Sequence, residues 1–306
     1  MIYVVLDPVP LRSCMIEGAM KMKIAVASGK GGTGKTTVAT SLARLASDNG
    51  YSTVYLDCDV EAPNGHLLLK PVIDRRELVK RMIPYVESAR CNLCGDCGSA
   101  CQFGAVVKLG DRIKVYPKLC KSCGACIHAC SRGAISEVEQ TVGYVEIGVS
   151  GELRFIQGQL DIGQPRAIPV IEAVRNLLPE DSKLALIDVP PGTSCPMVSA
   201  VRGVDFVLLV TDATPFGLSD LQMAVQAVQS LNLPVGVVVN RSGLGDHSVY
   251  SYCRAKYLDV MAELPYSVSV ATSYARGDLK AVLEEHDALL SQLLESLLSR
   301  VERCLS

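Results

Sequence analysis

The chain reads GKGGTGKT at residues 29–36, directly after the apolar stretch MKIAVA at residues 22–27. These eight residues fit the template G-x-x-x-x-G-K-[ST], a phosphate-binding loop (P-loop) that joins a buried strand to a helix. Its glycines let backbone N–H groups approach the phosphates of a nucleoside triphosphate closely. The stretch therefore predicts an α/β fold with a triphosphate site at the carboxyl end of the first strand.

Strands and helices alternate on both sides of a cysteine-rich segment. The expected strands after the first one cover residues 53–56, 184–187, 206–210 and 235–239, and the expected helices cover residues 35–47 and 169–177. Such alternation implies parallel pairing, and the polar residues that follow the strands lie where ligands collect in parallel sheets. We predict a doubly wound, mostly parallel P-loop sheet with a small inserted α+β domain.

Eight of the thirteen cysteines form two motifs with the same spacing, C-x2-C-x2-C-x3-C. The members are Cys91, Cys94, Cys97 and Cys101 in the first motif, and Cys120, Cys123, Cys126 and Cys130 in the second. This spacing is typical of four-iron clusters. Zinc is the main alternative, but zinc sites do not require the third and fourth cysteine of each motif. A disulfide framework is expected in short secreted proteins and does not fit this chain.

Composition excludes several classes of protein. The 306 residues include 49% hydrophobic and 20% charged residues, enough for one large domain and a small insertion. The net charge of −2 gives no broad attraction to nucleic acid or to an anionic membrane. No apolar stretch is long enough to span a membrane, and residues 1–14 make a poor secretory signal. We expect a cytoplasmic protein that binds no nucleic acid and has no stable membrane insertion.

The predicted organisation has three parts. They are an N-terminal appendage at residues 1–21, a discontinuous P-loop domain at residues 22–83 and 140–306, and an inserted two-cluster domain at residues 84–139. The basic run Arg75, Arg76, Lys80 and Arg81 is predicted to be a solvated face, with partner docking as the alternative. The Leu-rich tail at residues 279–305 is predicted to be a last helix packed on the sheet, because its acidic residues do not suit an anionic membrane.

The two cysteine motifs recur 29 residues apart and resemble the bacterial two-cluster ferredoxin. In that protein each cluster takes three cysteines from one motif and the last cysteine from the other. The resemblance implies that cluster one is bound by Cys91, Cys94, Cys97 and Cys130, and cluster two by Cys120, Cys123, Cys126 and Cys101. The proline that usually follows the fourth cysteine is replaced by Gln102 and Ser131.

Four further motifs resemble the MinD/Mrp family of deviant Walker ATPases, in the branch that carries an inserted ferredoxin domain. They read KGGTGKTT at residues 30–37, DCDVEAPN at 57–64, DVPPGT at 188–193 and NR at 240–241. The resemblance covers essentially residues 22–300. It implies ATP as the nucleotide, Mg²⁺ as its metal ion, and a homodimer that forms on ATP binding.

The resemblance also implies roles for individual residues. The phosphates and adenine would be held by Gly29, Lys30, Gly31, Gly32, Thr33, Gly34, Lys35, Thr36, Thr37 and Asn240. Mg²⁺ would be held by Thr36 and Asp188, with Asp57 assisting the metal shell. Lys30 matches the family's second lysine, which reaches the partner's nucleotide across the dimer. Asp59 matches the aspartate that orients the attacking water, so Lys30, Lys35 and Asp59 form the expected catalytic set.

Cys195 stands at the distance from Asp188 at which nitrogenase iron proteins carry a cluster ligand. The loop expected to supply the second ligand reads GQPR at residues 163–166 and contains no cysteine. Cys195 is therefore predicted to be a small buried residue. His66, His128, His247 and His286 share no metal-binding spacing and are predicted to be structural or surface residues.

Together these features predict a dimeric, ATP-hydrolysing iron–sulfur protein whose nucleotide state is coupled to its two [4Fe-4S] clusters. Three purposes remain open: ATP-gated electron transfer to a redox partner, delivery or assembly of clusters on an apo-acceptor protein, and MinD-like spatial regulation. A surface C-x2-C outside the two motifs would favour delivery, and a basic amphipathic tail would favour spatial regulation. Neither feature is present in the sequence.

Overall fold

The computed structural model describes residues 22–305, so the predicted appendage at residues 1–21 lies outside the described part. Its main sheet contains β1 (Met22–Ala27), β2 (Thr53–Asp57), β3 (Val72–Val86), β6 (Ile135–Ser150), β7 (Leu153–Leu160), β8 (Leu184–Asp188), β9 (Phe206–Asp212), β10 (Val235–Ser242) and β11 (Val260–Pro265). The strand order is β11-β10-β9-β1-β8-β2-β7-β6-β3. Strands β11 to β7 pair in parallel, whereas β6 and β3 are antiparallel additions at one edge.

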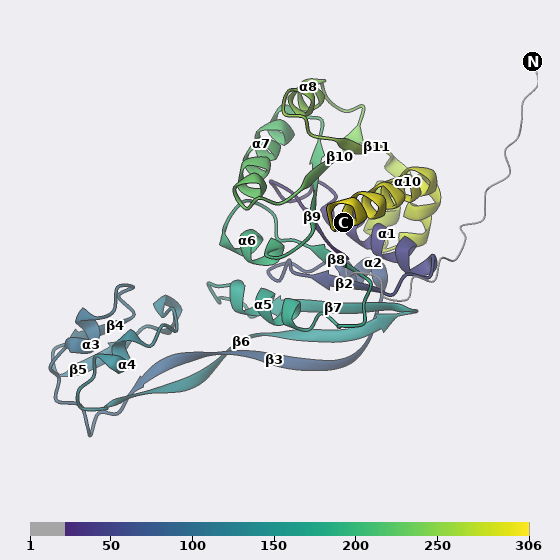
Figure 1. Ribbon diagram of the computed structural model, residues 1–306. Helices are drawn as coiled ribbons and strands as arrows, with labels where there is room; N and C mark the ends of the chain where they lie inside the picture. The colour runs from purple at the N-terminus through teal and green to yellow at the C-terminus, as the bar shows by residue number, and fades with distance from the viewer. Residues whose placement is uncertain (1–21, 306) are drawn as a thin grey trace, which may run out of the picture.

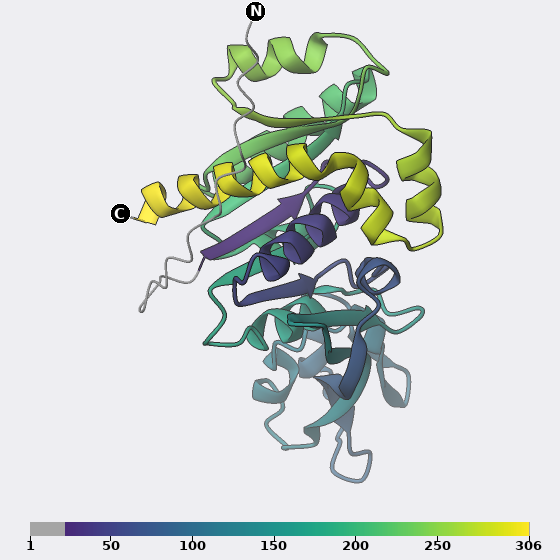
Figure 2. The ribbon, with the colours of Figure 1, turned by 90° about the vertical axis from the view of Figure 1, so that its right-hand side faces the viewer.

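Helices cover both faces of this sheet, as Figures 1 and 2 show. They are α1 (Lys35–Asp48), α2 (Gly65–Leu69), α5 (Ile168–Asn176), α6 (Cys195–Val201), α7 (Pro215–Ser230), α8 (Ser248–Ala255), α9 (Val268–Ala275) and α10 (Leu279–Leu305). One hydrophobic core joins the sheet to α5, α6, α7 and α8, and a second joins it to α1 and α10. The predicted mostly parallel α/β sheet and the packing of the tail helix are confirmed.

Burial on both faces explains why the central strands are continuous apolar runs. Residues Leu184–Asp188 of β8 are all buried, and so are Phe206–Asp212 of β9. No helix within the described part of the chain is long and apolar enough to cross a bilayer.

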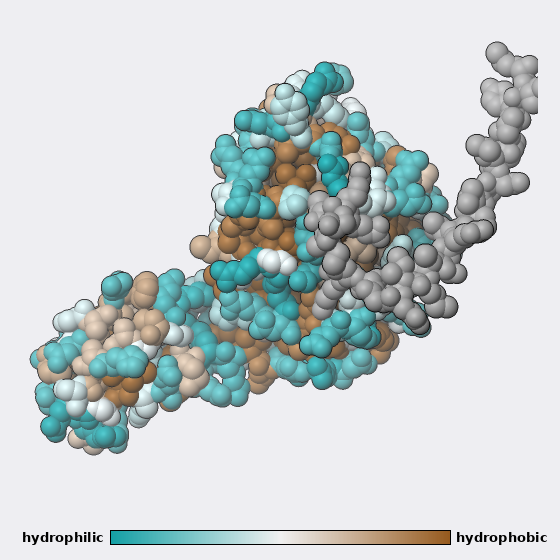
Figure 3. Space-filling model, in the orientation of Figure 1, coloured by the Kyte–Doolittle hydropathy of each residue, from teal (hydrophilic) through white to brown (hydrophobic). Residues whose placement is uncertain are grey.

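The cysteine-rich segment is carried at the end of a long antiparallel hairpin. Strands β3 and β6 pair from Val72 and Val149 to Val86 and Ile135, and both continue across the domain boundaries that the sequence predicts. Beyond them lie α3 (Asp96–Ser99), β4 (Val106–Leu109), β5 (Arg112–Val115), a 3-10 turn (Pro117–Leu119) and α4 (Ala125–His128). Figures 1 and 3 show this inserted unit, residues 87–134, as a lobe that projects from the main body.

The basic run lies on β3, a strand that the sequence pattern does not reveal. Arg76 forms an ion pair with Glu146 of β6, and the Lys80 Nζ lies 2.6 Å from an oxygen of Glu139. The predicted solvated face is wrong for Arg81, whose side chain is buried. A charged strand is hard to recognise because its cross-strand ion pairs replace the usual apolar pattern.

Candidate nucleotide site and cysteine cavities

The P-loop connects β1 to α1, and two of its glycines have no room for a side chain. A Cβ on Gly34 would lie 2.1 Å from the Asn240 amide nitrogen, and one on Gly29 would lie 2.2 Å from the Asp220 carbonyl oxygen. Gly34 also has a φ of 91°, which L side chains rarely adopt. The loop therefore needs glycine at these positions to bring its backbone close to the ends of the neighbouring elements.

Lys35 is buried at the start of α1 and faces two carboxylates. Its Nζ forms an ion pair with Asp188 at the end of β8, and lies 3.7 Å from an oxygen of Asp59. Burial alone would lower the pKa of Lys35, but Asp188 and Asp59 more than offset this effect and raise it. The Tyr55 hydroxyl donates to the other Asp188 oxygen at 3.0 Å, a contact that the motifs do not indicate.

Asp57 joins the same group of charges and is fully buried. Its two oxygens accept hydrogen bonds from the backbone N–H groups of Asp59, at 3.1 Å, and Gly65, at 3.0 Å. Burial and the nearby Asp188 raise the pKa of Asp57 to about 8, and burial likewise raises that of Asp59 to about 6. Three carboxyl groups thus lie near one lysine at the carboxyl ends of β2 and β8, and this lysine is their counter-charge.

A cavity of about 310 Å³ opens in front of this group. This volume is within the usual range for small-molecule sites. The predicted residues that line it are Gly31, Gly32, Gly34, Lys35, Thr36, Thr37, Asp59 and Asn240. Asn240 donates from its side-chain nitrogen to the Thr33 carbonyl oxygen at 2.8 Å, which ties the end of β10 to the P-loop.

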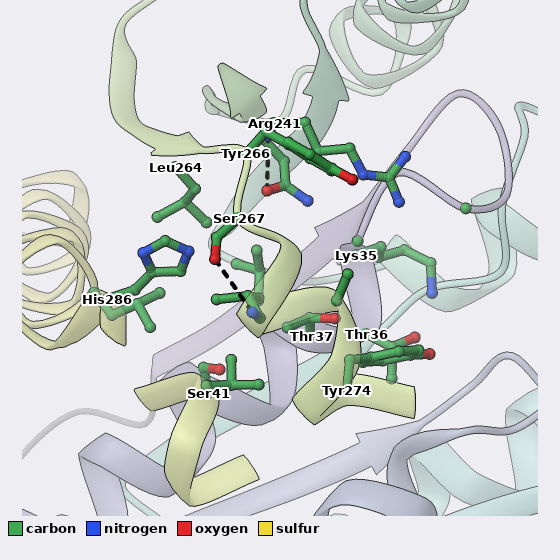
Figure 4. A pocket seen from close by; sticks show the side chains of 18 of the residues that line it. Lys35, Thr36, Thr37, Ser41, Arg241, Leu264, Tyr266, Ser267, Tyr274 and His286 are labelled. Atoms are coloured by element: carbon green, nitrogen blue, oxygen red, sulfur yellow. Dashed lines mark hydrogen bonds between the residues drawn. The ribbon is translucent and has the colours of Figure 1, made fainter. Parts of the chain in front are cut away.

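The far end of the cavity is built from residues that the motifs do not identify. In Figure 4, Lys35 and Thr36 lie at one end of the cavity, and Ser41 and His286 lie at the other. His286 is buried where the helical geometry of α10 breaks, with φ −116° and ψ 15°. The buried Ser41 hydroxyl has no hydrogen-bond partner among the described residues. His286 was predicted to be a structural or surface residue, and only the packing of α10 against α1 places it in the cavity.

Lys30 is bound within its own chain in this structure. Its Nζ lies 3.2 Å from an oxygen of Asp212 and 3.7 Å from an oxygen of Asp220. Asp212 ends β9 and Asp220 lies on α7, so neither acidic residue is near Lys30 in the sequence. A role for Lys30 across a dimer interface would require it to leave both partners.

The cysteines line two small cavities in the inserted unit. Cys91, Cys94, Cys97 and Cys130 line one cavity, and Cys101, Cys120, Cys123 and Cys126 line the other. Each cavity thus combines three cysteines of one motif with the fourth of the other, the grouping that the resemblance to two-cluster ferredoxins implies. Within residues 22–301, whose side chains the structure describes, no group of three or more His, Cys, Asp or Glu side chains is arranged to hold a single metal ion.

Backbone N–H groups donate to several of these sulfur atoms. Ala105 donates to Cys101 at 3.2 Å, and Ala134 donates to Cys130 at 3.3 Å. Burial would raise the pKa of the Cys101 thiol, but hydrogen bonds from the backbone of residues 103–106 lower it. Such donors favour the thiolate, the form that binds metal.

The two halves of the unit share an unusual backbone conformation. Leu93 and Ser122 occupy equivalent positions in the two motifs and have positive φ angles of 59° and 55°. A left-handed conformation at a non-glycine residue is uncommon and marks a constrained turn. The internal repeat therefore extends from the cysteine spacing to the backbone that presents the sulfur atoms.

Cys195 lies apart from both cavities. It is the first residue of α6 and is exposed, so the prediction of a buried residue is wrong. The chain leaves the buried end of β8 and reaches the surface at residues 191–194, directly before α6, a change that the apolar strand does not reveal.

A parallel sheet whose first strand ends in a glycine-rich loop, with a lysine facing carboxylates on the next strands, defines a P-loop nucleotide-binding protein. The CobQ/CobB/MinD/ParA nucleotide binding domain family, CbiA, matches residues 24–280. The chain belongs to this family of P-loop ATPases.

Three similar proteins illustrate the range of relatives. The uncharacterized protein MJ0578 of Methanocaldococcus jannaschii is 39% identical over 228 residues, which are 74% of this chain and 80% of that protein. The iron-sulfur cluster carrier protein of the same organism is 25% identical over 245 residues, which are 79% of this chain and 65% of that protein. The septum site-determining protein MinD of Pyrococcus horikoshii, solved with Mg-ADP, has a TM-score of 0.58 at 18% identity, over 91% of this chain and 96% of that chain.

Proposed function

We propose that this protein is a dimeric MinD/Mrp-like ATPase whose nucleotide state is coupled to two [4Fe-4S] clusters in the inserted unit. The observation that carries the proposal is the presence, in one chain, of a P-loop cavity and two cavities of four cysteines each. ATP hydrolysis would control electron transfer through the inserted unit, or the redox state of that unit would control hydrolysis.

The nucleotide cavity supplies the groups that phosphoryl transfer needs. Lys35 would exchange its contact with Asp188 for the β- and γ-phosphate oxygens, and Thr36 and Asp188 would hold Mg²⁺, with Asp57 assisting. Mg²⁺ would neutralise phosphate charge. Asp59 has a pKa of about 6, raised by burial, so it is mostly ionised at pH 7 and can accept a hydrogen bond from the attacking water. Asn240 would contact the adenine.

The inserted unit fits a pair of clusters. Each cavity has four cysteines and a partly apolar wall, with Val106 at one cavity and Ile135 at the other. The N–H donors at Cys101 and Cys130 would stabilise the negative charge of bound sulfur. Each bound cluster would act as a one-electron carrier, so a redox protein is the expected partner.

Cluster delivery is the second candidate function. It is favoured by the similarity to iron-sulfur cluster carrier proteins and by the exposure of Cys94 and Cys123, one ligand of each cluster. Exposed ligands would be the first to exchange with an apo-acceptor protein. The burial of Cys97 and Cys126 favours clusters that stay in place.

The first test is the composition and electron paramagnetic resonance (EPR) spectrum of anaerobically purified protein, with and without Mg-ATP. We expect about eight iron and eight acid-labile sulfide atoms per chain, the content of two four-iron clusters, and midpoint potentials that shift with nucleotide. Stoichiometric zinc without sulfide would contradict the cluster proposal. Complete transfer of iron to an apo-acceptor would favour delivery over electron transfer.

Lys30 offers a separate test of the dimer. Lys30→Ala should spare nucleotide binding, because the Lys35 contacts remain, and should abolish dimer-dependent ATP turnover. Binding would be measured with a fluorescent nucleotide, and turnover against protein concentration. Normal hydrolysis by the variant would contradict the assignment of Lys30 as the family's second lysine.

A further inference from the structure

Arg81 places a buried positive charge beside one of the two cysteine cavities. Its guanidinium donates to the carbonyl oxygens of Cys120, at 2.9 Å, and Pro117, at 2.8 Å, and to the Gln140 side-chain oxygen at 2.7 Å. Its Nε is buried without a hydrogen-bond partner among the described residues. All three acceptors are neutral. Most of the N–H donors of Arg81 therefore have a partner, but its positive charge is not balanced by a negative one.

A second guanidinium approaches the same place from the part of the chain that follows the inserted unit. Arg166, in the loop before α5, donates to the Leu119 carbonyl oxygen at 2.9 Å. Burial and the proximity of Arg166 lower the pKa of Arg81, so the two cations lie close enough to repel each other. The same loop passes close to the inserted unit at a second point, because a Cβ added at Gly163 would lie 3.6 Å from the Lys118 Nζ.

Neither guanidinium forms an ion pair with a carboxylate in the described part of the chain. Burying an unpaired charge is unfavourable, and two neighbouring like charges add to this cost. The arrangement is stabilised if an anion occupies the adjacent cavity. Cys120, whose carbonyl oxygen binds Arg81, is one of the four cysteines that line it.

The other cavity lacks a buried cation of this kind. Arg132 lines it but is exposed, and the neighbouring Arg90 is exposed and lies 3.5 Å from an oxygen of Glu87. The cavity beside Arg81 also has two exposed charged residues on its wall, Lys121 and Glu137, and their charges have opposite signs. Solvent screens exposed charges much more strongly than buried ones. The buried charge of Arg81 is therefore the main electrostatic difference between two cavities that are each lined by four cysteines.

We propose that Arg81 and Arg166 are the counter-charges of cluster two and make it the more easily reduced of the two clusters. This inference rests on the proposed function. A cluster bound by four thiolates is anionic, and an added electron increases its negative charge, so nearby cations favour the reduced form. One electron from an external low-potential donor would come to rest on cluster two, beside the loop that leads into α5. No bond forms or breaks in this step.

The test is a redox titration of the anaerobic full-length protein, followed by EPR spectroscopy. Arg166→Gln should lower the higher of the two midpoint potentials. We expect the equilibrium constant for reduction to fall about tenfold, which corresponds to 59 mV for a one-electron couple. Arg166→Lys should largely preserve the higher potential. Arg81→Gln should lower it further, and Arg132→Gln, at the other cavity, should leave it unchanged.

Iron and sulfide analysis separates the two levels of the hypothesis. Absence of both from the unmodified protein would overturn the proposed function. Two clusters whose higher potential stays unchanged in Arg166→Gln, or a shift confined to the lower potential, would overturn the counter-charge proposal alone. If Arg81→Gln loses iron because the unit misfolds, the redox titration of Arg166→Gln still tests the proposal, because Arg166 is only half-buried.

Discussion

The nucleotide cavity and the cysteine cavities are assembled in opposite ways. Lys35, Asp59, Asp188 and Asn240 come from distant parts of the chain and meet because parallel strands end at the same edge of the sheet. All eight cysteines lie between Cys91 and Cys130. The first site is therefore assembled by long-range packing of the sheet, whereas the residues of the second all lie within one segment of 40 residues.

The main body and the inserted unit also differ in the size of their hydrophobic cores. Two extensive clusters of buried side chains flank the main sheet. The small cluster of buried side chains at the inserted unit has four members, Cys97, Val106, Cys126 and, at the start of β6, Ile135, and two of these are cysteines. Units of this size usually require disulfides or metals for stability.

Cluster loss gives the largest expected effect. Cys97→Ser, or removal of iron with a chelator, should unfold residues 87–134 and expose them to protease, because metal binding supplies the folding free energy. Nucleotide binding should persist. Limited proteolysis with mass spectrometry would locate the cuts, and the exposed Cys195→Ser is the matched control. An inserted unit that stays protected without iron would remove the contrast between the two regions.

Lys35→Ala tests the preformed site. Truncating one partner of a buried charge contact costs about 2–5 kcal/mol of binding, or roughly 30- to 4,000-fold in affinity. We expect a loss of that size for Mg-ATP, measured by fluorescent nucleotide titration, with normal iron content. Lys280→Ala on α10 is the control, because that side chain is 86% exposed. Unchanged affinity in the Lys35 variant would rule out a phosphate contact.

Asp57 gives the nucleotide-free domain a specific pH dependence. Its folded pKa is about 8, raised mainly by burial, against about 3.9 for an unfolded aspartate. The folded state therefore binds more protons between these values, so the free energy of unfolding should fall as pH rises toward 8 and then level off. Urea denaturation across this range should show a flatter profile for Asp57→Asn, and an unchanged one for the exposed Asp287→Asn. A free energy of unfolding that rises with pH over this range in the unmodified protein would contradict a raised pKa for Asp57.

Ser41→Ala gives the smallest expected effects. It should increase the stability of the nucleotide-free domain and decrease its affinity for nucleotide. Removing an unpartnered buried hydroxyl should slightly stabilise the nucleotide-free domain, whereas losing a hydrogen bond to nucleotide should weaken binding by about 1 kcal/mol, or roughly fivefold. Calorimetry would measure both quantities. Ser47→Ala is the control, because Ser47 is buried on the same helix and does not line the cavity. Unchanged affinity would place the nucleotide away from Ser41.

The sequence by itself determined the parts whose geometry is local. Residues 29–36 define a phosphate-binding turn because glycine spacing and one lysine are sufficient to build it. The repeated cysteine spacing marked the eight cysteines as one pattern, whereas their division between two cavities was implied by the resemblance to two-cluster ferredoxins. Buried parallel strands were readable because both of their faces are apolar.

Only the tertiary structure decided which distant residues meet. The long hairpin of β3 and β6 was hidden because ion pairs such as Lys80 with Glu139 replace the apolar alternation of a strand. His286 reaches the nucleotide cavity through the break in α10, and Lys30 finds Asp212 and Asp220 through the packing of β9 and α7. Arg81 and Arg166 lie on the two separate segments of the predicted P-loop domain, 85 residues apart in the chain, and come together beside one cysteine cavity. Such contacts depend on how whole elements pack, and no local pattern of residues encodes that packing.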